Sequence, residues 1–134
     1  MSVFVDWDNQ DHTVIRLTLQ GRWQWAEVRQ VLRELGTLLD TVTYPTSVIV
    51  HVNQSAWLPG DIKDNVQQIT QTIHPYMGEV IIVTPLSIFV ELVFQVAALI
   101  GGFNFPYRIA PTLEEARRLL SEVPAYAAHF GAAD

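Results

Sequence analysis

With 134 residues, the chain has the length of a single domain and can bury a core without disulfide or metal staples. Hydrophobic residues make up 49% of it against 16% charged, which excludes intrinsic disorder, and the lack of cysteine excludes disulfides, thiolate zinc sites and thiol nucleophiles. The 14 acidic and 8 basic residues give a net charge of −6, which disfavours nucleic acid and anionic membranes as partners.

The first part of the chain predicts a hairpin, a helix and a buried strand. Two strands are expected at residues 3–5 and 13–19, because the turn formers of residues 8–11 separate them. Residues 25–41 carry apolar side chains at steps of three and four, which predicts a helix. Residues 46–53 are apolar on both faces, as is typical of a central parallel strand.

A second helix is expected to begin at Asp61, whose side chain is well placed as an N-cap, and to end at His74, which precedes a proline. Its buried stripe would be Ile62, Val66, Ile69 and Ile73.

The last part of the chain predicts two strands and two helices. A buried strand at 79–83 leads into a helix at 87–100, and an edge strand at 105–109 leads into a helix capped by Thr112. The order is therefore β-β-α-β-α-β-α-β-α. It predicts an α/β fold in which four helices cover a mixed, mostly parallel, five-stranded sheet.

Three local features accompany this order. An opening strand ends at Gly21 before a long helix, a buried strand and polar loop precede a helix that begins with Gly60-Asp61, and residues 105–116 form a last strand and a capped helix. In these features residues 1–122 resemble the STAS domain, the fold of bacterial anti-sigma-factor antagonists and of the cytoplasmic tails of sulfate transporters. The resemblance implies a protein-interaction or regulatory module and leaves 123–134 as a C-terminal tail.

The sequence departs from that family at its regulatory motif. Regulated members carry an Asp-Ser-Ser-Gly-type motif, with a phosphorylated serine, at the start of the second helix. Here residues 58–62 read Leu-Pro-Gly-Asp-Ile and offer no hydroxyl group, so no phosphoacceptor is carried over. Asp61 has two interpretations, a helix cap or a fixed negative charge that imitates phosphoserine, and the cap is favoured.

The loop after the central strand is the candidate ligand or partner site, because ligands bind at the carboxyl ends of strands in open α/β sheets. Its residues are Asn53, Gln54, Ser55, Trp57 and Asp61.

Other signals favour structural roles. His51 could be a pocket base or a ligand contact, but a hydrogen-bonded core histidine is favoured. Trp7, Trp23 and Trp25 are interpreted as core residues in preference to a second interaction surface. No metal, cofactor or catalytic residue is predicted, since the histidines lack ligand spacing and neither a phosphate loop nor a nucleophile elbow occurs.

The third predicted helix has more apolar surface than a sheet needs. Only Ser87, Glu91 and Gln95 are polar within it, and it is too short to span a membrane. It could pack inside the fold, mediate self-association, or form the wall of an apolar pocket. Its candidate residues are Ile88, Phe89, Leu92, Val93, Phe94, Val96 and Leu99.

Together these observations favour a non-catalytic, STAS-like interaction module that forms a homodimer through this helix. The alternative is a small carrier of a lipid-like, apolar ligand held between sheet and helices. An enzyme that uses His51 with Asp61 or Ser55 is the least favoured hypothesis. The N-terminal residues do not resemble a signal peptide, so a cytoplasmic location is expected.

Overall fold

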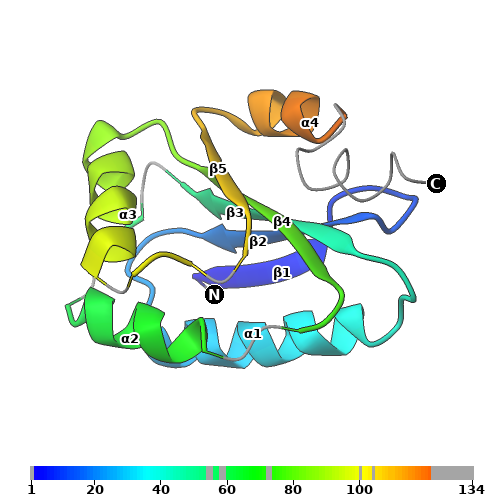
Figure 1. Ribbon diagram of the computed structural model, residues 1–134, viewed down its shortest axis with the longest axis horizontal. Helices are drawn as coiled ribbons and strands as arrows, with labels where there is room; N and C mark the ends of the chain where they lie inside the picture. The colour runs from blue at the N-terminus through cyan, green and yellow to red at the C-terminus, as the bar shows by residue number, and fades with distance from the viewer. Residues whose placement is uncertain are drawn as a thin grey trace.

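The computed structural model describes residues 2–53, 56–57, 60–71, 74–99, 101–103 and 105–121, and the predicted tail lies outside this part of the chain. Five strands and four helices follow one another in the predicted order (Figure 1). Their bounds are β1 Val3–Trp7, β2 Val14–Leu19, α1 Trp25–Leu39, β3 Thr46–Val52, α2 Ile62–Ile69, β4 Met77–Val83, α3 Ser87–Leu99, β5 Tyr107–Ala110 and α4 Leu113–Ser121.

The strands form one sheet in the order β1-β2-β3-β4-β5. β1 and β2 are antiparallel and joined by the predicted hairpin, while the other neighbours are parallel. In the hairpin turn, Oδ1 of Asn9 accepts the backbone N–H groups of Thr13 and Val14 at 3.0 and 3.1 Å. The predicted α/β class and mixed, mostly parallel sheet are therefore confirmed.

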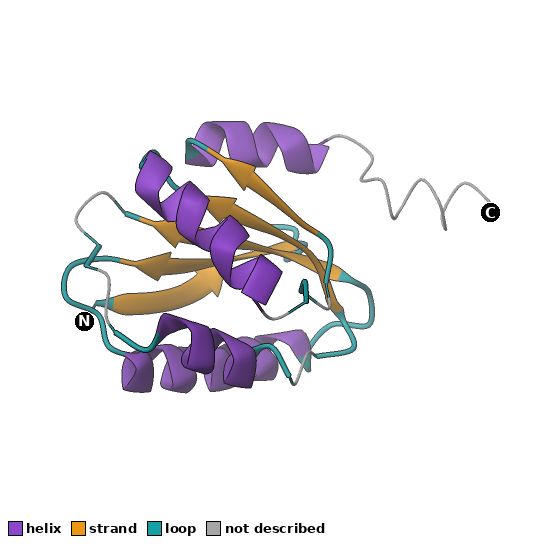
Figure 2. Ribbon diagram, turned by 60° about the vertical axis from the view of Figure 1, so that its left-hand side comes forward, coloured by secondary structure: helices purple, strands orange, loops and turns teal. Residues whose placement is uncertain are grey.

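The helices divide between the two faces of the sheet (Figures 1 and 2). On one face, α4 covers β3, β4 and β5, and its Ala116 packs with Ile49, Ile81 and Val83. The opposite face, which we call the three-helix face, is turned towards α1, α2 and α3. Alternation along each strand decides which side chains reach which face, so Ile49 and His51 lie on the α4 face whereas Val50 and Val52 lie on the three-helix face.

Helix α1 forms where the sequence predicts it because its apolar positions recur with the helical period. Val28, Val31, Leu35 and Leu39 are buried against the sheet. At its start, the side chain of Glu27 accepts the backbone N–H of Gln24 at 3.2 Å, which satisfies a donor left free by the first helical turn. The helix ends at Leu39, two residues before the predicted end.

Helix α2 begins where predicted but lacks the predicted side-chain cap, and it ends earlier than predicted. Asp61 stands at the N-cap position, but its backbone is left-handed (φ 57°) and its side chain makes no capping hydrogen bond. Capping normally requires an extended backbone, which directs the side-chain oxygen towards the first free N–H groups, so the predicted cap is wrong. The helix ends at Ile69 rather than at His74, and Ile73 lies outside the described residues.

The last predicted cap is confirmed, and two boundaries shift. Oγ1 of Thr112 accepts the N–H of Glu115 at 3.1 Å at the start of α4. β4 begins at Met77, two residues earlier than predicted, and β5 runs from Tyr107 to Ala110 as an edge strand.

Two buried carboxylates form ion pairs that link β5 to β4 and α4 to the β1–β2 hairpin. Glu79 accepts Nε of Arg108 at 3.0 Å, and Asp8 accepts both Nη1 of Arg16 at 2.9 Å and Nη2 of Arg117 at 2.8 Å. Because each buried carboxylate is paired, the α4 face is held by ion pairs as well as by apolar packing.

Candidate functional site

An apolar cavity of about 240 Å³ lies between the sheet and helices α1, α2 and α3, and we call it the inner cavity. The sheet side of its wall is formed by neighbouring side chains of the three central strands, Leu17, Val50 and Ile82. Among the described residues that line it, only Thr70 and two tryptophans carry a polar side-chain atom. The site is therefore an almost entirely hydrophobic chamber.

Burial along the wall shows that this space is not filled by protein. Val50 and Ile82 belong to central strands, yet both remain half-buried. Every residue of α2 keeps part of its surface accessible, and of the thirteen residues of α3 only Val96 and Ala97 are fully buried. Protein interiors normally have few voids larger than a water molecule, so a gap of this size under two helices is unusual.

A second cavity of about 330 Å³ adjoins the first and shares Leu17, Leu32, Val50 and Phe105 with it. It extends the chamber along α1 towards Leu39 and His74.

The polar side chains of the second cavity already have partners. Nδ1 of His74 accepts the N–H of Tyr76 at 3.1 Å, so Nε2 carries the proton and donates to Oδ1 of Asp40 at 2.7 Å. Oγ1 of Thr70 donates to the backbone oxygen of Val66 at 2.7 Å. With these groups satisfied, the second cavity also offers a ligand mainly apolar contacts.

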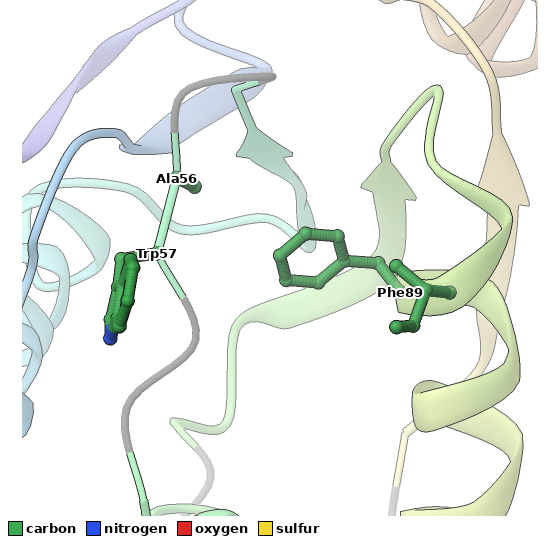
Figure 3. Close-up of a pocket in the computed structure, with 4 residues that line it drawn as sticks. Ala56, Trp57 and Phe89 are labelled. Atoms are coloured by element: carbon green, nitrogen blue, oxygen red, sulfur yellow. The ribbon is translucent and has the colours of Figure 1, made fainter.

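A third hollow, which we call the outer pocket, lies at the carboxyl edge of the sheet and has a volume of about 260 Å³. Its wall is formed by Ala56 and Trp57, which follow β3, and by Ile88 and Phe89, at the start of α3 (Figure 3). The ring of Phe89 extends from α3 towards the segment that carries Ala56, and Phe89 also lines the inner cavity. Phe89 therefore stands between the outer pocket and the chamber.

Of the predicted loop site, Trp57 lies in the outer pocket together with residues of the predicted third helix. Trp57 is exposed in the outer pocket, where the guanidinium carbon of Arg22 lies 4.8 Å from the centre of its ring. Asn53 is half-buried just after β3, and Asp61 precedes α2. Gln54 and Ser55 lie outside the described residues.

The seven candidate residues of α3 divide between two directions. Phe89, Leu92, Val93 and Val96 line the inner cavity. Ile88, Phe94 and Leu99 are exposed by 67%, 55% and 63%. The helix therefore has both a cavity wall and exposed apolar side chains.

The predicted core position of Trp23 is confirmed, and Trp25 is partly buried against the same cluster. Both line the inner cavity, and Trp23 also packs with the buried residues Val28 and Val31. Nothing in the sequence indicated that these two side chains also border an unfilled space.

Comparison with known proteins finds no matching family model, no matching curated protein and no matching solved structure. The assignment of the candidate site therefore rests on the geometry of this chain alone. In the part of the chain that the structure describes, no cluster of three or more histidine, aspartate or glutamate side chains could hold a metal ion. No described helix has the length and apolar character that crossing a membrane requires.

His51 lies on the α4 face, so the sheet separates it from the chamber and from α2. Burial lowers its pKa, and the positive charges of Arg16 and Arg117 lower it further. The imidazole is consequently held in its neutral form near pH 7, beside two cations that hydrogen-bond to Asp8.

This lowered pKa predicts a pH dependence of stability. Because the unfolded chain binds a proton at His51 more readily than the folded one, stability falls as the pH drops through the unfolded pKa of about 6.5, and this loss ends below the folded pKa. Replacing His51 with Gln should remove this contribution. We expect urea unfolding at about pH 7.5 and 5.5 to show a smaller loss of stability for His51→Gln than for the unmodified protein. An equal loss in both proteins would contradict the assignment.

Proposed function

We propose that the protein binds an elongated apolar ligand in the chamber formed by the inner and second cavities. The observation that carries this proposal is the unfilled apolar space between the sheet and α1, α2 and α3, where volumes of about 240 and 330 Å³ adjoin. Small-molecule sites usually occupy roughly 300–1,000 Å³ and are mostly apolar, and this chamber has the same properties.

The chemistry of the walls favours an apolar occupant over water. An ordered water needs two to four polar partners, whereas both ring nitrogens of His74 are already hydrogen-bonded and Thr70 already donates its hydroxyl hydrogen. A hydrocarbon chain would instead gain about 25 cal/mol for each Å² removed from water. It would also contact Val50 and Ile82, which the protein alone leaves half-buried.

The position of the outer pocket supports a route into this chamber. It opens at the carboxyl edge of the sheet, between Trp57 and Ile88, and Phe89 forms its boundary with the inner cavity. Ligands of open α/β sheets bind at this edge. The proposed role is that of a small carrier or sensor.

Native mass spectrometry of freshly purified protein tests this proposal. We expect a small-molecule mass that stays with the folded protein and is lost on denaturation. Ligand-stripped protein should then take up N-phenyl-1-naphthylamine, a neutral fluorophore whose emission rises in apolar surroundings, and hexylbenzene should displace it. Stripped protein that binds neither compound would refute the proposal.

A second proposal is self-association through the outer face of α3, as expected of a STAS-like interaction module. The supporting observation is the exposure of three large apolar side chains of α3, Ile88, Phe94 and Leu99. At the helical period, Ile88 and Leu99 lie on one side of the polar stripe of this helix and Phe94 lies on its other side. Large exposed apolar side chains on one helix are typical of interaction surfaces. The resemblance to the STAS family itself stays a prediction.

Replacing Phe94 with Glu tests the second proposal. We expect the unmodified protein to show a concentration-dependent dimer in size-exclusion chromatography with light scattering, and Phe94→Glu to stay monomeric, because a charge in an apolar interface loses its hydration. Phe89 is unsuitable for this test, since it lines the inner cavity. Phe4→Glu, at an exposed residue of β1, is the matched control and should leave the dimer unchanged. A monomer at high concentration before any substitution would refute the dimer.

A further inference from the structure

Trp23 has a buried hydrogen-bond donor without a partner. The residue follows β2, is only 6% exposed and lines the inner cavity. Within the described residues, its Nε1 is the one buried side-chain nitrogen or oxygen that makes no hydrogen bond. Buried polar groups are almost always paired, because an unpaired donor has lost its water without any compensation. This N–H therefore requires an explanation.

The neighbouring tryptophan shows that the local structure is able to pair an indole. Trp25 lines the same cavity, and its ring lies edge-to-face with that of Trp23 at 4.9 Å and 84°. Its Nε1 donates to the backbone oxygen of Gly60 at 2.8 Å. Of these two neighbouring indoles, the partly buried one has its N–H satisfied by the protein and the buried one does not.

An acceptor for Trp23 is best supplied by a ligand. The surrounding wall is formed by side chains such as Leu19, Val28 and Val52, which have no acceptor. Besides the two indoles, only Thr70 among the described lining residues carries a polar side-chain atom, so a water molecule at Nε1 would find few of the further partners that an internal water needs. The oxygen of a ligand already held by apolar contacts would complete the hydrogen bond without any other polar group.

We propose that the ligand carries a neutral carbonyl oxygen that accepts the Nε1–H of Trp23 while its hydrocarbon part fills the chamber. This inference rests on the proposed function and adds the chemical class of the ligand, an uncharged ketone, ester or amide with an apolar chain. A carboxylate is disfavoured, because a charge next to a wall of leucine and valine would lose its hydration without a cationic partner.

Two probes of nearly the same size test this assignment. Hexanophenone carries one carbonyl oxygen, and hexylbenzene replaces that group with a methylene. Displacement of N-phenyl-1-naphthylamine gives the affinity of each. We expect Trp23→Phe to weaken hexanophenone about five- to tenfold and to change hexylbenzene by less than about twofold, because only the ketone loses a hydrogen bond. Trp25→Phe is the matched control and should change both probes by the same factor.

A measurement on the unmodified protein covers the case in which Trp23→Phe does not fold. In ¹H–¹⁵N NMR spectra, the indole proton of Trp23 should move downfield with hexanophenone and not with hexylbenzene, whereas the indole proton of Trp25 should respond equally to both. Equal responses of Trp23, or equal losses of both probes in Trp23→Phe, would overturn the inference and leave the proposed function intact. Failure of both probes to bind would refute the proposed function, and this inference with it.

Discussion

Replacing Val50 with Phe is expected to abolish ligand binding and to stabilise the protein at the same time. Val50 is half-buried at the centre of the sheet, and its side chain borders both the inner and the second cavity. A phenyl ring there would occupy space that a ligand needs. It would also remove part of a void whose cost is about 24 cal/mol per Å³, so stabilisation of about 0.5–2 kcal/mol is expected.

The matched control is Ile49→Phe, one residue earlier on the same strand. Ile49 is fully buried on the α4 face, where Ile81, Val83 and Ala116 pack around it. An added ring has no space there, so a loss of about 1–3 kcal/mol is expected, with ligand binding retained in the molecules that fold. Urea unfolding and displacement of N-phenyl-1-naphthylamine provide the two measurements. Destabilisation of Val50→Phe to the same extent as Ile49→Phe would show that the chamber is not empty.

The sequence was sufficient to predict the fold because its elements have strong local signals. The apolar period of α1, the turn residues before Thr13 and the cap at Thr112 each identify an element without reference to the rest of the chain. Along β2, Leu17 and Arg16 lie on opposite faces of the sheet, as the alternation of a strand requires. Local periodicity therefore contained the information that identifies the elements, their order along the chain and the class of the fold.

The chamber could be predicted only in part, because its size depends on how far two helices stand from the sheet. The composition of α3 showed an excess of apolar surface, but it could not separate the cavity wall at Phe89 and Val96 from the exposed surface at Phe94. Asp61 failed as a cap because its backbone is left-handed, a conformation that residue type and spacing do not reveal. The unpaired N–H of Trp23 was likewise out of reach, because its pairing depends on segments distant in sequence.

Replacing Phe89 with Ala is expected to speed ligand exchange by about tenfold or more, because movement of such a barrier commonly limits entry and release. Phe89 is the one residue that lines both the outer pocket and the inner cavity, as these are formed by the described residues (Figure 3). Removing its ring would join the two spaces beside Trp57. Since Phe89 is only half-buried, the cost in stability should be about 1–2 kcal/mol, below that of a fully buried phenylalanine.

Leu92→Ala provides the matched control for this change. Leu92 lies one turn further along α3 and lines the inner cavity without reaching the outer pocket. Its truncation should lower affinity and stability to a similar extent but leave the rate of entry unchanged. Stopped-flow mixing of N-phenyl-1-naphthylamine with each variant, followed by displacement with hexanophenone, measures entry and release separately. If Phe89→Ala and Leu92→Ala enter at the same rate, the ligand does not pass between Trp57 and α3, and another opening must serve the chamber.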